Sequence, residues 1–197
     1  MTNVNPPSPF ILEQVDSWLV TRPEKATMQP VQLVDLACGS GRHITAILGR
    51  GYKDTLQITA VDIDHQSLDT LLFSANNTAE ITPVCFDLER EGVDLSANLG
   101  GHLFDLVLVT NYLHRPLLGQ IFGLVRPSGM LLYETFGHGN ADFGRPSNPD
   151  FLLQEGELAS ALPEEFAVRH QFFGQRQDVY PTLPPAIICQ FAARRQE

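Results

Sequence analysis

The stretch that most constrains the fold is residues 33–43, LVDLACGSGRH. An apolar run ends in an acid, a turn of small residues follows, and a helical pattern begins after the turn. This order is typical of a buried parallel strand, a tight loop and the start of a helix. Glycines in such a loop let a ligand approach the backbone, and the first N–H groups of the helix face that ligand. The stretch therefore predicts a ligand-binding loop.

The same strand-then-helix pattern continues along the chain, which predicts a mostly parallel sheet built from right-handed crossovers. The last two apolar segments have no helix between them and predict an antiparallel pair at one edge of the sheet. Pro83 places its own strand near an edge, because proline cannot donate to a strand ladder. The predicted strands are residues 31–36, 57–62, 81–86, 104–109, 130–136, 166–174 and 186–193, with helices at 40–50, from 65, at 116–124 and at 155–162, and a turn at 126–129.

A length of 197 residues predicts one domain with three parts. Residues 1–29 hold an N-terminal helix, which either only packs on the domain or forms a lid whose candidate ligand contacts are Phe10 and Trp18. Residues 30–136 form the core that binds a cofactor. Residues 137–197 supply the final strand pair and, at 137–149, a long loop rich in Gly, Asn, Asp and Pro that we expect to face the substrate.

Composition excludes several classes of protein. A formal net charge of −10 argues against a broad nucleic-acid surface, which needs a basic face. Cys38, Cys85 and Cys189 form no CxxC pair and predict free thiols in a reducing compartment, with the last two as core residues. Met1–Asn5 do not resemble a signal peptide, no apolar run is long enough to span a bilayer, and the six histidines lack metal-ligand spacing. We therefore expect a cytoplasmic protein without a metal or a membrane partner; the oligomeric state stays open.

Three successive predicted strands end in acids, namely Asp35, Asp62 and Asp87. The carboxyl ends of parallel strands line one crevice in which ligands bind. Asp62 follows Gly41 by 21 positions, close to the spacing of an acid that accepts hydrogen bonds from a ribose diol. The alternatives are that Asp62 is only a solvated turn residue, or that Asp64 binds the ribose.

A dinucleotide cofactor must be weighed because it uses the same geometry. Its fingerprint is GxGxxG, whereas this loop has Ala37 in place of the first glycine and lacks the final one. Asp35 would also repel a pyrophosphate but would attract an ammonium or sulfonium group. The loop therefore favours a positively charged nucleoside over NAD.

The set of motifs resembles that of class I S-adenosylmethionine-dependent methyltransferases. Residues 35–41 are similar to the glycine-rich first motif, Val61-Asp62 to the second, Asp87-Leu88 to the third and Asn111-Tyr112 to the fourth, and residues 126–129 are similar to the turn before the fifth strand. The resemblance covers residues 30–135 and departs from the family at Ala37, where glycine is common. It implies a single Rossmann-like α/β domain with a mostly parallel seven-stranded sheet and helices on both faces. Phe10 and residues 155–158 also resemble small-molecule methyltransferases of the tellurite-resistance type.

The resemblance also implies the roles of individual residues. Gly39 and Gly41 would lie against the methionine part of the cofactor, and Asp35 would lie near its ammonium group. Asp62 would bind the ribose and Ile63 would pack on the adenine. The complete set of cofactor-binding residues is Asp35, Ala37, Gly39, Gly41, Asp62, Ile63, Asp87, Leu88, Asn111 and Phe10, where Asp87 accepts from the adenine amine and the Leu88 N–H faces the ring.

Methyl transfer from a sulfonium needs alignment above all, and a base only where the acceptor must lose a proton. The candidate catalytic residues are Asn111, Tyr112 and His114, and the candidate substrate contacts are Tyr133, Glu134, His138 and Arg145. For His114 and Arg145 the alternative is a solvent-exposed residue without a role. We expect Cys38 to serve packing rather than catalysis.

The sequence therefore predicts an S-adenosylmethionine-dependent methyltransferase that acts on a small molecule. Two alternatives remain at this point, a nicotinamide-dependent oxidoreductase on the same kind of sheet and a member that binds the cofactor without transferring methyl. Neither the acceptor nor the atom that is methylated can be read from the motifs.

Overall fold

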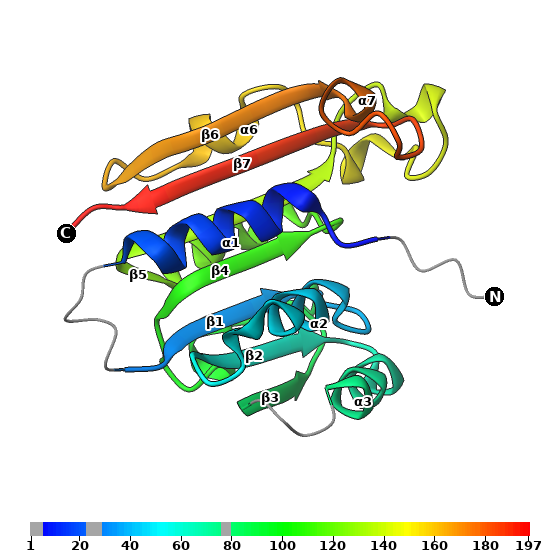
Figure 1. The fold of residues 1–197 in the computed structure, drawn as a ribbon. Helices are drawn as coiled ribbons and strands as arrows, with labels where there is room; N and C mark the ends of the chain where they lie inside the picture. Colours follow the sequence, from blue (N-terminus) through cyan, green and yellow to red (C-terminus); the bar gives the residue numbers. More distant parts are fainter. Residues whose placement is uncertain (1–5, 23–28, 76–79) are drawn as a thin grey trace.

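The computed structural model describes residues 6–22, 29–75 and 80–197, so Met1–Asn5 and the prediction made from them lie outside the described residues. Seven strands form one sheet in the order β3-β2-β1-β4-β5-β7-β6 (Figure 1). Their bounds are β1 Val31–Leu36, β2 Leu56–Asp62, β3 Glu80–Cys85, β4 Phe104–Thr110, β5 Val125–Phe136, β6 Phe166–Gln175 and β7 Ile187–Arg195.

The pairing of the strands confirms the predicted fold class. Strands β1 to β5 run parallel to one another, while β7 pairs antiparallel with both β5 and β6. The strand β3, which contains Pro83, lies at one edge of the sheet, as the proline predicted. The sequence predicted the final antiparallel pair. The structure shows in addition that β7 lies between β5 and β6.

Helices cover both faces of the sheet, and each face has its own apolar core. The helices α1 (Pro9–Thr21), α2 (Arg42–Ile47) and α3 (His65–Ser74) pack on the face that presents Leu33 and Leu106. The helices α4 (Leu95–Asn98), α5 (Leu118–Gly123) and α6 (Glu157–Ala161) pack on the opposite face, which presents Val34 and Val107. Short helical segments complete the chain at Leu48–Tyr52, Arg115–Leu117, Asn140–Asp142, Pro149–Phe151 and α7 (Arg176–Val179).

The helix α1 lies over β4 and β5 and runs along them (Figure 1), and it begins as the sequence predicts. The Ser8 hydroxyl accepts a hydrogen bond from the Ile11 N–H, and Pro9 occupies the first turn, where no N–H partner is needed. Phe10 and Trp18 are both buried. The prediction that Trp18 contacts the ligand is wrong, because its side chain lies beside Asp105 at the start of β4, the opposite end of the strands from the ligand loop.

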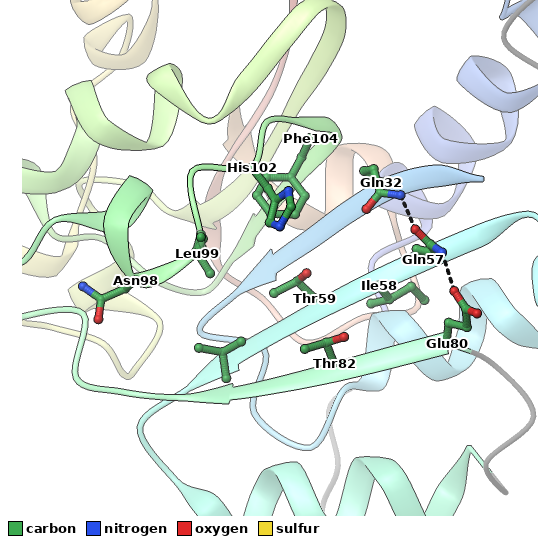
Figure 2. A pocket seen from close by; sticks show the side chains of 12 residues that line it. Gln32, Gln57, Ile58, Thr59, Glu80, Thr82, Asn98, Leu99, His102 and Phe104 are labelled. Atoms are coloured by element: carbon green, nitrogen blue, oxygen red, sulfur yellow. Dashed lines mark hydrogen bonds between the residues drawn. The ribbon is translucent and has the colours of Figure 1, made fainter. Parts of the chain in front are cut away.

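One part of the sheet is covered by no helix of the described residues. The helix α4 is a single turn, so the β1–β3 region of that face borders a cavity of about 460 Å³, which we call the sheet groove (Figure 2). Three of its side chains form a hydrogen-bonded ladder across the strands, in which Gln32 donates to Gln57 and Gln57 donates to Glu80 (Figure 2). The groove is lined by Gln32, Gln57, Ile58, Thr59, Glu80, Thr82, Val84, Asn98, Leu99, Gly100, His102 and Phe104.

Two local predictions are corrected by the structure. The predicted turn at residues 126–129 lies inside β5, where an irregularity in the pairing with β4 and a φ of 65° at Ser128 accommodate the bend within a continuing strand. Cys85, predicted to be a core residue, is exposed because β3 is an edge strand, whereas Cys38 and Cys189 are buried. No helix among the described residues is both long and apolar enough to cross a membrane.

Candidate cofactor and acceptor site

The loop after β1 has the backbone shape that a close ligand requires. Ala37, Gly39 and Gly41 all have positive φ angles, of 55°, 55° and 71°. At Gly41 the positive φ favours glycine, and a Cβ there would also displace the Leu71 side chain of α3. A Cβ on Gly39 would meet no atom within 4 Å, which leaves its backbone open on the ligand side. Alanine at position 37 tolerates this conformation at a cost of about 1 kcal/mol, because Cβ crowds the next carbonyl when φ is positive.

The structure brings the predicted acids Asp62 and Asp87 into one cavity. This cavity, which we call the strand-end pocket, has a volume of about 350 Å³. It lies beyond the carboxyl ends of β1, β2 and β3, where the parallel topology predicts ligand binding. Its lining residues are Ala37, Asp62, Ile63, Asp87, Leu88, Glu89 and Tyr112.

The carboxylates of this pocket are held in fixed orientations by backbone N–H groups. Asp62 accepts from the Gly39 N–H at 2.7 Å through one oxygen and from the Asp64 N–H at 2.9 Å through the other. Asp87 accepts from the Glu89 N–H at 2.8 Å. Each oxygen has a second lone pair, so both acids can still accept from a ligand. Ile63 is 65% exposed at this place, so its apolar side chain is open to contact with a ligand.

Asp35 lies deeper than the other two acids. Its side chain is fully buried, and neither of its oxygens has a hydrogen-bond partner. Burial raises the pKa of this carboxyl to about 7, although the nearby positive charge of Arg42 opposes the shift. A buried carboxyl without a partner is costly to the folded protein, and a cationic group beside it would remove that cost.

The predicted catalytic residues follow β4. Asn111 is exposed with a φ of 54°, and Tyr112 lines the strand-end pocket with a buried hydroxyl that has no partner. Burial raises the pKa of Tyr112, so its phenol stays protonated at neutral pH and can donate a hydrogen bond. His114 is half-buried just before a short helical turn. Tyr133, predicted to contact the substrate, is fully buried instead and donates to the Tyr112 carbonyl at 2.8 Å, so it holds this loop in place.

A buried polar network beneath the start of α1 was not predicted from the sequence. His43 accepts at Nε2 from the Ser8 N–H at 3.0 Å, so its proton resides on Nδ1, 3.2 Å from the Thr110 hydroxyl. Burial lowers the pKa of His43 to about 3 and keeps the ring neutral. The network therefore ties α1 to α2 and to the end of β4.

Glu134 belongs to the same network, and it was a predicted substrate contact. Its Oε2 accepts from the Ser8 hydroxyl at 2.8 Å and from the Gln190 amide at 2.7 Å, and that amide also reaches the Tyr180 hydroxyl at 3.3 Å. The partners come from positions 8, 180 and 190, too far apart in the chain for a motif to reveal them.

The other predicted residues lie away from the strand-end pocket. Phe10 stacks on His170 of β6, with ring centroids 4.8 Å apart. His138 and Arg145 are exposed on the loop after β5. The described part of the chain holds no group of three or more His, Cys, Asp or Glu side chains that could bind a metal ion.

Comparison with known proteins gives matches in structure but not in sequence. No family model matches the chain, and no curated protein matches it. TehB from Haemophilus influenzae matches with a TM-score of 0.65 and 16% identity over 93% of this chain and 62% of that chain. The CurJ carbon methyltransferase matches with a TM-score of 0.67 and 14% identity over 95% of this chain and 54% of that chain.

A third solved structure, magnesium protoporphyrin IX methyltransferase (ChlM) from Synechocystis PCC 6803 with bound SAH, matches with a TM-score of 0.63 and 13% identity over 94% of this chain and 82% of that chain. The chain thus spans little more than half of TehB and CurJ. The strand order of the sheet and the similarity to these solved structures lead to the same conclusion. The chain has the fold of the class I S-adenosylmethionine-dependent methyltransferases.

Proposed function

We propose that this protein is an S-adenosylmethionine-dependent methyltransferase that acts on a small molecule. The observation that carries the proposal is the strand-end pocket, in which Asp62 and Asp87 follow adjacent strands beside the glycine loop. The fold is compatible with this activity, and the neighbours TehB, CurJ and ChlM support it. A cytoplasmic location remains a prediction from the free cysteines.

The residues of the pocket fit the cofactor group by group. Asp35, whose oxygens have no partner, would accept from the ammonium group, and the open side of Gly39 would face the methionine chain. Asp62 would accept from the ribose hydroxyls, and the exposed Ile63 side chain would pack on the adenine. Asp87 would accept from the adenine amine and the Leu88 N–H would face the ring. Ala37 and Gly41 shape the loop, and Asn111 and Phe10 are the remaining predicted contacts.

When bound, S-adenosylmethionine supplies an activated methyl group on its sulfonium, and the protein has to bind and align it with the acceptor. Tyr112, with its protonated and unpartnered hydroxyl, would donate a hydrogen bond within the pocket. Asn111 and His114 are the other candidates at this strand end. Glu134 would contact the acceptor, as would His138 and Arg145 on the loop after β5. Residues 1–29 would then serve as the lid, 30–136 as the cofactor core and 137–197 as the acceptor region.

The direct test is calorimetric titration with S-adenosylhomocysteine. We expect binding by the unaltered protein and a loss of about 100-fold in affinity for Asp62→Ala, because two charge-assisted hydrogen bonds to the ribose are removed. Absence of binding, or equal affinity in the two proteins, would overturn the proposal.

A fluorescence titration with NADH examines the oxidoreductase alternative, for which the glycine spacing is unsuitable. Tight cofactor binding without product in a broad acceptor screen with labelled cofactor would favour a non-catalytic member.

A further inference from the structure

A separate cavity, which we call the basal cavity, lies at the opposite end of the sheet from the strand-end pocket. It has a volume of about 250 Å³. The end of α1, the starts of β4 and β5 and the end of β7 come together there (Figure 1). Three arginines and one acid line it, together with the indole of α1, namely Arg22, Arg126, Arg194, Asp105 and Trp18.

The three arginines differ in how far the protein already pairs them. Arg126 donates from Nη1 to both carboxylate oxygens of Asp105 at 3.0 Å, and from Nη2 to a backbone carbonyl at 2.9 Å. Asp105 also accepts from the Gln32 N–H at 2.8 Å, so this ion pair is part of the fold. For Arg22 and Arg194, by contrast, no ion pair within 4.0 Å and no side-chain hydrogen bond is found in the described part of the chain.

Arg22 shows that the basal cavity lacks an acceptor. Its Nη1 is buried and has no hydrogen-bond partner. A guanidinium keeps its proton in proteins, so it cannot avoid the cost of burial by becoming neutral. Arg22 follows the last turn of α1, where the partial negative charge of the helix end favours a cation. That attraction gives Nη1 no acceptor, and it does not act on Arg194, which lies on β7.

The charges of the lining match those of a phosphate group. Three guanidinium groups and a single carboxylate line the cavity, in a chain whose formal net charge is −10. A phosphate group carries a charge of about −1.5 to −2 at neutral pH, and its oxygens accept the paired hydrogen bonds of a guanidinium. The acid Glu197 lies outside the lining. It accepts from the Ser128 hydroxyl at 3.4 Å, and no ion pair joins it to an arginine among the described residues.

The size of the basal cavity limits what it can hold. Pockets for drug-sized ligands have volumes of roughly 300 to 1,000 Å³, and this cavity is smaller. It therefore suits an ion or a small ester better than a nucleotide. Trp18 and Pro127 supply apolar atoms to the same lining, beside which the carbon part of a small ester can pack.

We propose that the basal cavity binds a phosphate group through Arg22 and Arg194. Arg126, oriented by Asp105, adds a third positive charge to the same site. The phosphate has two possible sources, the free inorganic ion and a small phosphate monoester. This site is separate from the strand-end pocket and does not depend on the proposed methyl transfer.

The first experiment uses the fluorescence of Trp18, which is the only tryptophan of the chain and lines the cavity. The protein is titrated with inorganic phosphate, and with chloride at the same ionic strength as the control. We expect a saturable change with phosphate alone, and a matching heat of binding in calorimetry. Absence of both signals with phosphate, together with their absence with phenyl phosphate, would overturn the proposal.

Variants then locate the binding. We expect Arg22→Gln and Arg194→Gln each to lower the affinity for phosphate about tenfold, since each removes a charged hydrogen-bond donor. Arg169→Gln is the matched control, because Arg169 is exposed on β6 and does not line the cavity. Equal affinities in the three variants would show that the ion binds elsewhere, and would overturn the proposal.

Asp105→Asn gives a change of the opposite sign, which damage to the fold would not produce. The amide oxygen can still accept from the Gln32 N–H, while the negative charge that repels the anion is gone. We expect the affinity for phosphate to rise several-fold in this variant, and a fall would contradict the proposal.

The source is decided by comparing inorganic phosphate with phenyl phosphate. Tighter binding of phenyl phosphate, weakened by Arg22→Gln and Arg194→Gln, assigns the cavity to a phosphate monoester. Equal or tighter binding of inorganic phosphate, with the same dependence on the two arginines, assigns it to the free ion.

Discussion

The sheet groove and the strand-end pocket lie on the same strands, and they differ in hydrogen bonding as well as in size. The groove is larger, about 460 Å³ against 350 Å³. Its ladder of Gln32, Gln57 and Glu80 is internally hydrogen-bonded (Figure 2), and none of its lining residues has a buried polar side-chain atom without a partner. The pocket has the unpartnered Tyr112 hydroxyl in its wall and the unpartnered Asp35 carboxyl nearby. The two cavities therefore differ in unmet hydrogen bonding, which a ligand in the strand-end pocket could satisfy.

The largest expected effect is on ligand affinity, and it should differ between the acids at the two ends of β3, Asp87 beside the pocket and Glu80 in the groove. We expect Asp87→Ala to lower the affinity for S-adenosylhomocysteine between 10- and 100-fold, because a charge-assisted hydrogen bond to the adenine amine is lost. Glu80→Ala, which alters the groove, should leave the affinity within twofold. Calorimetry measures both. Equal losses in the two variants would show that the comparison between the cavities is wrong.

The next effect is a pH dependence that only the pocket should show. Burial raises the pKa of Asp35 to about 7, so between pH 8 and pH 6 the free protein takes up a proton there, and the affinity for S-adenosylhomocysteine should fall about tenfold. Asp35→Asn should bind weakly and without this slope. Since the folded state holds the proton more tightly than the unfolded state, this group should make the free protein less stable as pH rises from about 4 to 7. A stability curve without that contribution would contradict the assignment.

A smaller effect is expected from the apolar wall of the pocket. Ile63→Ala should weaken binding of 5′-methylthioadenosine about fivefold, since adenine covers only part of this exposed side chain. Thr82→Ala in the groove is the control and should have no effect. The two titrations, carried out at one pH and salt concentration, show which cavity holds the base.

The smallest effect concerns backbone strain beside the pocket. Ala37→Gly should raise the free energy of unfolding by less than about 1 kcal/mol, because relief of a positive φ is partly offset by the greater freedom of glycine in the unfolded chain. Urea unfolding measures this change. The matched substitution Thr82→Gly, in a strand of the groove, should lower stability, and a loss in both would show that Ala37 is not strained.

Much of the fold could be predicted because apolar periodicity and turn residues are local. The order of the strands, the edge position of Pro83 and the antiparallel end of the sheet all followed from short stretches, whereas the start of β5 did not. The errors also have local causes. Cys85 lies in an apolar run, but this run forms an edge strand and leaves the cysteine exposed. Trp18 lies on the buried face of α1, as its spacing predicted, but at the end of the helix that is far from the ligand loop.

The sequence by itself determined the order of strands and helices, the glycine-rich ligand loop at residues 37–41, and the acids Asp35, Asp62 and Asp87 at successive strand ends. These features depend on neighbours in the chain and on the two-residue and 3.6-residue periods. Only the tertiary structure decided which acid is buried without a partner, and it alone brought Ser8, Glu134 and Gln190 together. Burial and the approach of charges from distant segments arise when the sheet closes against its helices, and no local pattern in the chain encodes them.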